Sequence, residues 1–193
     1  MAYKVNEIFY SLQGEGIHTG TPAIFIRFAF CNLHCPFCDT DFKQSYELPR
    51  SAIIKAIKDY PAELVVLTGG EPTLQDLEPL IDALHEAGKF VAIETNGTSE
   101  VPNNADWVTC SPKVLFAKNA FLKLKKANEV KVIYDAKAKV DDFGIIAQHY
   151  YLQPCDTGNS ERNENIINDC INYIKQHPKW KLSLQTQKIL KVR

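Results

Sequence analysis

The chain has 193 residues, of which 45% are hydrophobic, and its 22 Lys and Arg residues nearly balance 23 Asp and Glu residues. A surface that is close to neutral argues against a nucleic-acid groove as the main binding site, and no apolar run is long enough to cross a bilayer. The length predicts a single domain, residues 1–193, with a core of its own but too few residues for a complete eight-unit β/α barrel.

Short apolar runs and helical spacings alternate along the chain. Residues 3–9 alternate as a loose strand and end in the polar, glycine-bearing loop 11–16. Periodicity then predicts strands at residues 23–28, 64–67, 90–93, 107–110, 130–134, 150–153 and 182–186, and helices at 48–60, at 77–84, in a lysine-rich segment after residue 113, and at 166–174. We expect Asp76 to cap the second helix and Gly88 to end it.

This alternation of strand and helix predicts an α/β fold in which parallel strands are joined by right-handed crossovers. With about six core parallel strands, the expected architecture is an open, partial (β/α) barrel. Ligands of such barrels lie at the carboxyl ends of the strands. The segments at those ends are rich in polar residues and predict one binding rim, made of residues 31–38, 68–71, 94–96, 111–113 and 153–156.

Three thiols on one loop, Cys31, Cys35 and Cys38, are separated by three residues and then by two. They cannot all pair as disulfides, and neighbouring loop cysteines rarely meet the geometry of that bond. Structural zinc takes four protein ligands, whereas iron–sulfur clusters take thiolates in compact runs. His34 adjoins Cys35 and would strain to reach the same ion. We therefore favour a 4Fe-4S cluster with one open iron over a zinc-stabilised binding module without catalysis.

The first residues of the chain carry no apolar signal-peptide core, which predicts a cytoplasmic protein with reduced thiols. We interpret the remaining cysteines as packed small residues, and place Cys170 on the apolar face of a helix. Five lysines form a local basic patch that we interpret as a solvated helix face without function: Lys118, Lys123, Lys125, Lys126 and Lys131.

Two further polar positions could bind a substrate or a metal. Arg27 shares one face of a predicted strand with Ala23 and Phe25, and a buried guanidinium needs an anionic partner, either a protein carboxylate such as Glu15 or a carboxylate of the substrate. The hydroxyl of Thr40 could ligate Mg²⁺, with Asp39 and Asp41 beside it as supporting residues.

Gly69 and Gly70 follow a buried strand and allow the backbone to approach a ligand closely. Glu71, held by Pro72, can accept hydrogen bonds from an ammonium group, although the same residues also suit a simple turn before a helix. Together with the cysteine spacing and Phe37, this Gly-Gly-Glu-Pro segment resembles the radical S-adenosylmethionine superfamily. The resemblance implies that the open iron binds S-adenosylmethionine and that one electron cleaves it to a 5′-deoxyadenosyl radical.

A longer ordered set of motifs narrows the resemblance to the 7-carboxy-7-deazaguanine synthase family. It comprises Leu-Gln-Gly-Glu-Gly at 12–16, Arg27, the cysteine loop followed by Asp-Thr, Thr-Gly-Gly-Glu-Pro at 68–72, Glu-Thr-Asn-Gly-Thr at 94–98, Ser-Pro-Lys at 111–113, Gln-Pro at 153–154 and Gln-Thr at 185–186. The family converts 6-carboxy-5,6,7,8-tetrahydropterin to 7-carboxy-7-deazaguanine and releases ammonia. The rival within the superfamily is a glycyl-radical enzyme activating enzyme.

The resemblance implies a role for each matching residue. The cluster would be held by Cys31, Cys35 and Cys38, and Mg²⁺ by Thr40. Glu15 and Glu94 would be catalytic residues that hydrogen-bond the pterin nitrogens. The pterin would contact Leu12, Gln13, Gly14, Arg27 and Thr68. S-adenosylmethionine would contact Phe37, Cys38, Asp39, Gly70, Glu71, Ser111, Pro112, Lys113, Gln153, Pro154, Cys155 and Asp156.

The resemblance also implies an electron donor such as flavodoxin and a homodimer. The sequence departs from the family at Gln187, where a histidine often follows the Gln-Thr pair. Some members contact the substrate through the terminal carboxylate, which here would belong to Arg193.

Overall fold

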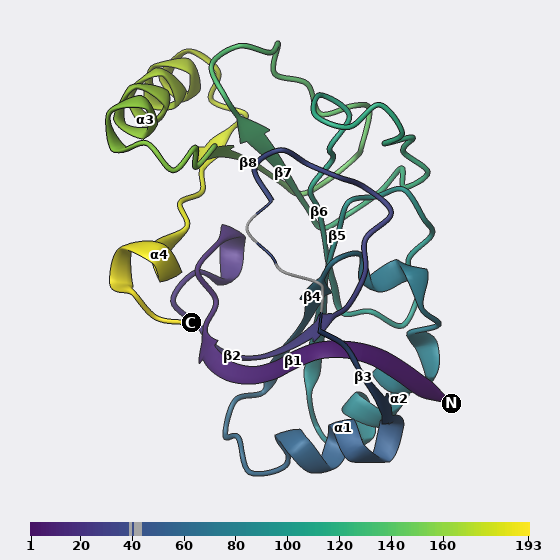
Figure 1. The fold of residues 1–193 in the computed structure, drawn as a ribbon. Coiled ribbons are helices and arrows are strands. Elements are labelled where there is room, and N and C mark those ends of the chain that lie inside the picture. Colours follow the sequence, from purple (N-terminus) through teal and green to yellow (C-terminus); the bar gives the residue numbers. More distant parts are fainter. Residues whose placement is uncertain (39, 41–43) are drawn as a thin grey trace.

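The computed structural model describes residues 1–38, 40 and 44–193. In these residues nine strands form one curved sheet in the order β3-β1-β2-β4-β5-β6-β7-β8-β9 (Figure 1). The strands are β1 (Ala2–Leu12), β2 (Pro22–Phe28), β3 (Tyr46–Pro49), β4 (Leu64–Gly69), β5 (Phe90–Thr95), β6 (Trp107–Cys110), β7 (Glu129–Tyr134), β8 (His149–Pro154) and β9 (Lys181–Leu182). From β2 through β4 to β9 all neighbours are parallel. The expected α/β partial barrel is therefore confirmed.

An antiparallel edge, which the sequence analysis did not predict, precedes the parallel strands. β1 pairs antiparallel with β2 on one side and with β3 on the other. Because β1 runs against β2, the loop after Leu12 lies at the amino ends of the parallel strands, and residues 13–18 turn back there. Gln13 and Gly20 join the two sides of this turn, with Gly20 N donating to Gln13 O at 2.7 Å.

The four α-helices of the described residues are α1 (Arg50–Ile57), α2 (Glu78–Glu86), α3 (Ser160–Gln176) and α4 (Thr186–Leu190). α1 and α2 cover the outside of the sheet near β1 and β5, α3 covers β8, and α4 lies at the open side of the barrel near the C-terminus (Figure 1). None of these helices is long and apolar enough to span a membrane.

The outer core forms as the helical spacing predicted. Ile53 and Ile57 of α1 and Leu80 and Ile81 of α2 are buried in one apolar cluster with the outward side chains of β2, β4 and β5. α1 begins later than predicted because residues 46–49 form the edge strand β3.

The inward side chains of the same strands make a smaller apolar layer, which includes Ala23 and Phe25 of β2, Val66 of β4 and Ala92 of β5. Arg27 continues this inner face of β2, as predicted, so it reaches the interior of the barrel above that layer.

Three local predictions are wrong. Asp76 does not cap α2, because the N-cap is Leu77 and makes no side-chain hydrogen bond. The lysine-rich segment is not a helix: Lys123 N and Leu124 N both donate to Gly97 O, so the backbone bonds to a neighbouring loop. The strand expected at 182–186 ends at Leu182, since Thr186 N donates to Gly14 O at 3.1 Å and α4 begins there.

The end of α2 follows the prediction for Gly88. The helix ends at Glu86, and Gly88 adopts a φ of +71° with its N–H donating to His85 O at 2.8 Å. A left-handed residue after the last turn is the usual glycine position of a helix terminus.

Replacing Leu80 by Ala tests the outer core. Leu80 is fully buried (0% exposed), so the cavity left behind should lower the free energy of unfolding by about 2–5 kcal/mol. Leu74→Ala, at a side chain that is 47% exposed, is the control and should change it by about 0.5 kcal/mol or less. Denaturant unfolding followed by circular dichroism measures both, and equal losses would contradict the assignment of the core.

Candidate functional site

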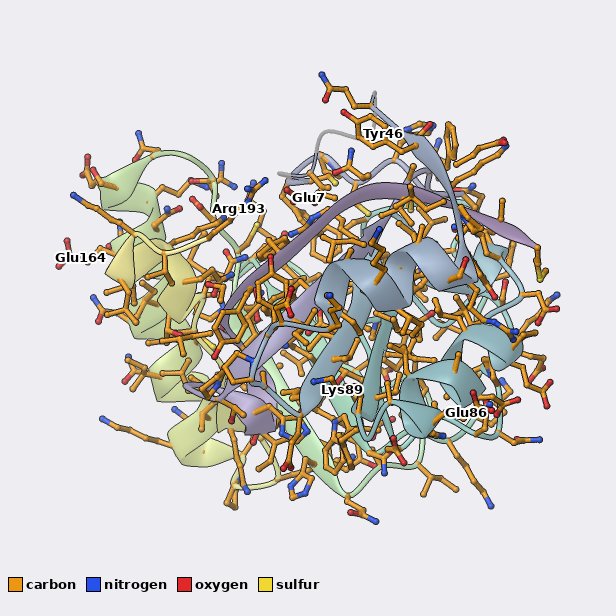
Figure 2. The ribbon with its side chains drawn as sticks, turned by 90° about the horizontal axis from the view of Figure 1, so that it is seen from below. Glu7, Tyr46, Glu86, Lys89, Glu164 and Arg193 are labelled. Atoms are coloured by element: carbon orange, nitrogen blue, oxygen red, sulfur yellow. The ribbon has the colours of Figure 1, made fainter. Side chains whose placement is uncertain are left out.

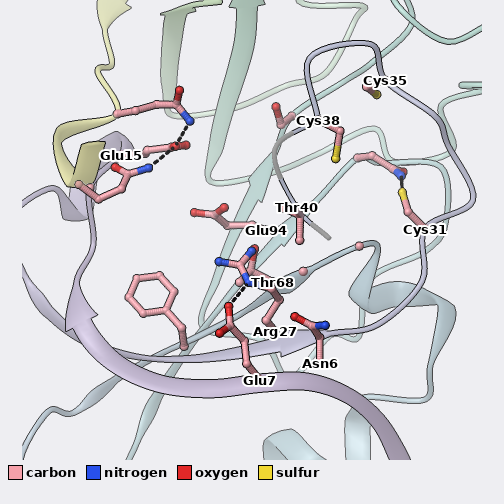
Figure 3. Close-up of a pocket in the computed structure, with 18 of the residues that line it drawn as sticks. Asn6, Glu7, Glu15, Arg27, Cys31, Cys35, Cys38, Thr40, Thr68 and Glu94 are labelled. Atoms are coloured by element: carbon pink, nitrogen blue, oxygen red, sulfur yellow. Dashed lines mark hydrogen bonds and ion pairs between the residues drawn. The ribbon is translucent and has the colours of Figure 1, made fainter. Parts of the chain in front are cut away.

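One cavity of about 1040 Å³ opens inside the barrel and runs from the cysteine loop to the loop at residues 12–15 (Figure 3). Of the residues predicted from the sequence, Glu71 and Pro112 do not line it, and Asp39 and Asp41 lie outside the described residues. All the others do: Leu12, Gln13, Gly14, Glu15, Arg27, Cys31, Cys35, Phe37, Cys38, Thr40, Thr68, Gly70, Glu94, Ser111, Lys113, Gln153, Pro154, Cys155 and Asp156.

The three loop thiols are free and face this cavity from one side. Cys38 N donates to Cys35 O at 3.1 Å, which closes a tight turn between them. Cys31 and Cys35 pack against a small apolar cluster of Leu33, Ala117 and Ala120. Burial raises the pKa of both thiols.

The donor set fits a cluster with one open iron better than a closed zinc site. His34 is exposed and does not line the cavity. Cys110 and Cys170 are buried in a separate core cluster, as predicted. Within the described ranges, no three His, Cys, Asp or Glu side chains already stand as close together as a metal ion requires. Three thiolates from one loop suit iron–sulfur ligation, whereas structural zinc needs a fourth ligand.

The cysteine loop begins directly against the end of β4, and the two glycines make this possible. Gly70 N donates to Phe28 O at 3.0 Å, and Glu71 N donates to Phe30 O at 2.8 Å. A Cβ on Gly70 would lie 1.7 Å from Phe30 O, so only glycine fits. Phe30, directly before Cys31, has a φ of +70°. A bulky residue in that conformation is strained, and such strain is typical of functional loops.

Glu71 points away from the cavity and braces the rim. It is 1% exposed and accepts hydrogen bonds from Thr73 N (3.1 Å), Thr73 Oγ1 (2.6 Å), Thr95 Oγ1 (2.6 Å) and Asn96 N (2.7 Å). Asn96 in turn donates its Nδ2 to Asn32 Oδ1 at 3.0 Å. One carboxylate thus connects the ends of β4 and β5 to the cysteine loop.

Arg27 finds a protein carboxylate, but not the predicted Glu15. Its Nε donates to Glu7 Oε1 at 2.9 Å (Figure 3). The other oxygen of Glu7 pairs with Arg193, and the two side chains meet at the surface of the barrel (Figure 2). Both guanidinium groups lie over the ring of Phe9, at 5.6 Å and 5.1 Å from its centroid. Glu7 was not among the predicted site residues, because the local sequence pattern does not reveal the antiparallel pairing of β1 with β2.

Glu15 is paired with a lysine that the sequence analysis assigned to the surface. Lys131 is 3% exposed, forms an ion pair with Glu15 and lies 3.8 Å from Glu94 Oε1. Gln13 Nε2 also donates to Glu94 Oε1, at 2.9 Å. The interpretation of Lys131 as part of a solvated patch is therefore wrong. The position of Lys131 within the apolar strand at 130–134 was the feature of the sequence that indicated burial.

The C-terminal segment covers Glu15 from the open side of the barrel. Gln185 Nε2 and Gln187 Nε2 each donate to Glu15 Oε1 at 3.1 Å (Figure 3). Burial alone would raise the pKa of Glu15, but the Lys131 ammonium and these amide donors outweigh it and hold that pKa well below its ordinary value. Burial alone would lower the pKa of Lys131, and the neighbouring carboxylates raise it instead.

The remaining predicted residues form the wall beside the cysteines. Lys113 Nζ donates to Ser111 O (2.8 Å) and Ser111 Oγ (2.5 Å), and burial lowers the pKa of this lysine. Gln153 is buried and accepts from Ser183 Oγ at 3.2 Å. Asp156 pairs with Lys188 at 2.8 Å. A partly buried ammonium that lines the cavity and has neutral partners suits an anionic ligand group, such as a carboxylate.

Comparison with known sequences gives a consistent set of relatives. The model of the radical SAM superfamily matches residues 25–175. The chain is 49% identical to a 7-carboxy-7-deazaguanine synthase of Bacteroides thetaiotaomicron, with all of both chains covered. It is 37% identical to the protein of that name from Haemophilus influenzae, over 97% of this chain and 93% of the relative.

Solved structures agree with this similarity. The crystal structure of QueE from Escherichia coli matches with a TM-score of 0.73 and 32% identity, over 95% of this chain and 94% of that chain. Streptococcus suis SuiB bound to S-adenosylmethionine matches with a TM-score of 0.50 and 15% identity, over 83% of this chain and 51% of that chain. The second likeness shows the fold alone.

Replacing Gly70 by Ala tests the close contact below the cysteine loop. The added Cβ would collide with the Phe30 backbone, so the loop should shift and the iron content after anaerobic reconstitution should fall. Gly88→Ala is the control, because no atom lies within 4 Å of its Cβ position and its strained φ should cost only about 1 kcal/mol. Unchanged iron content in Gly70→Ala would show that the contact does not position the thiols.

Proposed function

Because the chain belongs to the radical SAM superfamily and, within it, to the 7-carboxy-7-deazaguanine synthase family, we propose that it converts 6-carboxy-5,6,7,8-tetrahydropterin to 7-carboxy-7-deazaguanine, contracting the ring and releasing ammonia. The observation that carries the proposal is that the two ends of one cavity have different chemical groups. Three free thiols face one end, and a set of paired charges faces the other.

The cofactor end of the site would use Cys31, Cys35 and Cys38 to hold a 4Fe-4S cluster. With S-adenosylmethionine bound, this centre supplies the radical that removes a hydrogen atom from the substrate. Gly70 lets the start of the cysteine loop pack directly against the end of β4. Lys113 lines the cavity and offers an ammonium whose partners in the described residues are the carbonyl and hydroxyl oxygens of Ser111. That ammonium suits the carboxylate of S-adenosylmethionine.

The substrate end would recognise a small, planar, polar heterocycle. Arg27 would bind the pterin carboxylate, which is chemically equivalent to the Glu7 carboxylate that it contacts here. Gln13, Glu15 and Glu94 would contact the pterin nitrogens. Thr68 lines the cavity between these groups. Fixed charges and hydrogen-bonding groups of this kind hold a reactant in one orientation and exclude water, and this positioning is the protein's contribution to radical chemistry.

Further parts of the proposal rest on the family resemblance. Thr40 lines the cavity, and its hydroxyl would bind Mg²⁺ together with the substrate carboxylate. Residues 1–193 would act as one domain, paired in a homodimer and reduced by an electron donor such as flavodoxin. A cytoplasmic location is consistent with six free cysteines.

Two alternatives are distinguished by the site. A glycyl-radical enzyme activating enzyme must admit a peptide segment of another protein, whereas Glu15 and Glu94 here suit a compact substrate with several N–H groups. A zinc-stabilised module would not need the charged groups at the far end of the cavity.

Anaerobic turnover of carboxytetrahydropterin by the reduced, reconstituted protein, with mass detection of the product, tests the function. Cys35→Ala should lose the cluster and all product formation. Cys170→Ala, at a buried position in a separate core cluster, is the matched control and should keep its iron and its activity. A colourless, iron-free wild-type protein after anaerobic purification would instead support the zinc module.

Replacing Arg27 by Gln removes the cation proposed for the substrate carboxylate. A hydrogen bond to a charged group contributes about 1.5–3 kcal/mol, so KM for the carboxypterin should rise roughly 10- to 150-fold. Arg50→Gln, at an exposed arginine of α1 on the outside of the sheet, should leave KM unchanged. Steady-state kinetics measures both, and an unchanged KM in Arg27→Gln would place the carboxylate elsewhere.

A further inference from the structure

We propose that Lys131 is a positioning residue of the active site. Its ammonium holds the side chains of Glu15 and Glu94 together at the substrate end of the cavity, so that they can accept hydrogen bonds from the N–H groups of the heterocycle. This inference rests on the proposed function.

The position of Lys131 in β7 is unusual for a lysine. Its neighbours Val130 and Val132 are buried in the separate core cluster that also contains Cys110 and Cys170. Because side chains alternate along a strand, Lys131 points to the opposite face, into the barrel. It lines the cavity and is 3% exposed. Lysine is almost never buried this fully unless it is paired. The burial of Lys131 therefore depends on its carboxylate partners.

The two carboxylates that Lys131 joins come from distant parts of the chain. Glu15 lies in the loop after β1, and Glu94 lies in β5. Lys131 forms an ion pair with Glu15 and lies 3.8 Å from Glu94 Oε1. It therefore lies between them and fixes their separation.

The surroundings of Glu15 explain why a cation is needed. The charged groups that face it are Lys131 and Glu129 from β7, Glu94 from β5, and Lys113 after β6. Glu129 is buried, accepts a hydrogen bond from Ile17 N at 2.9 Å, and has a pKa that burial raises. Three acidic side chains thus share one interior region, and without a cation burial and like-charge repulsion would favour protonation of Glu15.

The hydrogen bonds within the protein show which carboxylate oxygens of Glu15 and Glu94 remain free to accept from a ligand. Glu15 Oε1 accepts from Gln185 and Gln187, and its other oxygen faces Lys131. Glu94 Oε1 accepts from Gln13. Among the described residues, Glu94 Oε2 has no protein donor, and Glu94 points into the cavity in Figure 3. A carboxylate accepts hydrogen bonds only, whereas a protonated carboxyl also donates one. A fixed, ionised pair therefore suits a ligand edge that carries N–H donors.

The test compares Lys131→Met with Lys131→Arg in the reconstituted holoenzyme. Lys131→Met keeps the length of the side chain but removes the charge, and KM for the carboxypterin should rise at least about tenfold. Lys131→Arg keeps a cation and should recover part of this loss. Iron content and the dissociation constant of S-adenosylmethionine should stay unchanged in both. The exposed Lys125→Met is the control and should behave as wild type.

The pH profile separates positioning from a merely structural role. In wild type, Lys131 holds the pKa of Glu15 low, so kcat/KM should have no acid limb from Glu15 between pH 6 and 8. In Lys131→Met only the amide donors of Gln185 and Gln187 still oppose the effect of burial, so the pKa of Glu15 rises. As the pH is lowered through the new pKa, kcat/KM should fall. A wild-type profile in Lys131→Met would overturn the proposal.

A comparison in the Glu15→Gln background covers the case in which Lys131→Met alone does not fold. Glu15→Gln with Lys131→Met removes both charges together and should fold. If Lys131 acts through Glu15, adding Lys131→Met to Glu15→Gln should change KM little, because the two effects are not additive. A further rise in KM as large as about tenfold would overturn the inference. Wild-type protein that does not turn over the carboxypterin would refute the proposed function. Turnover by wild type with no effect of Lys131→Met on KM would refute only the role of Lys131.

Discussion

The upper rim of the cavity depends on the buried carboxylate of Glu71. Its two oxygens accept four hydrogen bonds from Thr73, Thr95 and Asn96, and Asn96 passes the connection on to Asn32 in the cysteine loop. Burying a carboxylate is unfavourable unless its hydrogen bonds are made. A shift of any one of these segments would therefore leave the Glu71 carboxylate, or one of its donors, without a hydrogen-bond partner. The thiols keep their place over the cavity because the ends of β4 and β5 cannot move independently.

The two ends of the cavity have different surroundings, and each suits its proposed ligand. At the cysteine end, Leu33, Ala117 and Ala120 pack against Cys31 and Cys35 and keep water from one side of these two residues. At the other end, Glu15, Glu94 and Lys131 form a network of fixed charges. Pre-arranged charges can orient a polar heterocycle without reorganising as it binds. The parallel strands between the two ends set the distance that separates the cofactor from the substrate.

The sequence predicted the features that depend on local patterns. Apolar runs located six parallel strands, and the spacing of Cys31, Cys35 and Cys38 located the metal loop that the structure places on the cavity wall. It could not predict features that depend on distant segments. The antiparallel β1 brings Glu7 to Arg27, and the C-terminal turn brings Gln187 to Glu15. Glu71 turns away from the cavity and accepts from the loop donors. Lys131 lies near several lysines in the sequence, and only the alternation of side chains along β7 indicates that it faces the interior.

The hydrogen bonds between the C-terminal segment and the loop at residues 14–15 join parts of the chain that are about as far apart in sequence as the fold allows. Thr186 bonds Gly14, Gln187 bonds Glu15, and Arg193 pairs with Glu7. Closing so large a loop costs conformational entropy that only later contacts return, and contacts of this range form slowly. During synthesis the sheet can therefore assemble strand by strand. The C-terminal segment closes its side of the cavity only after every strand is in place.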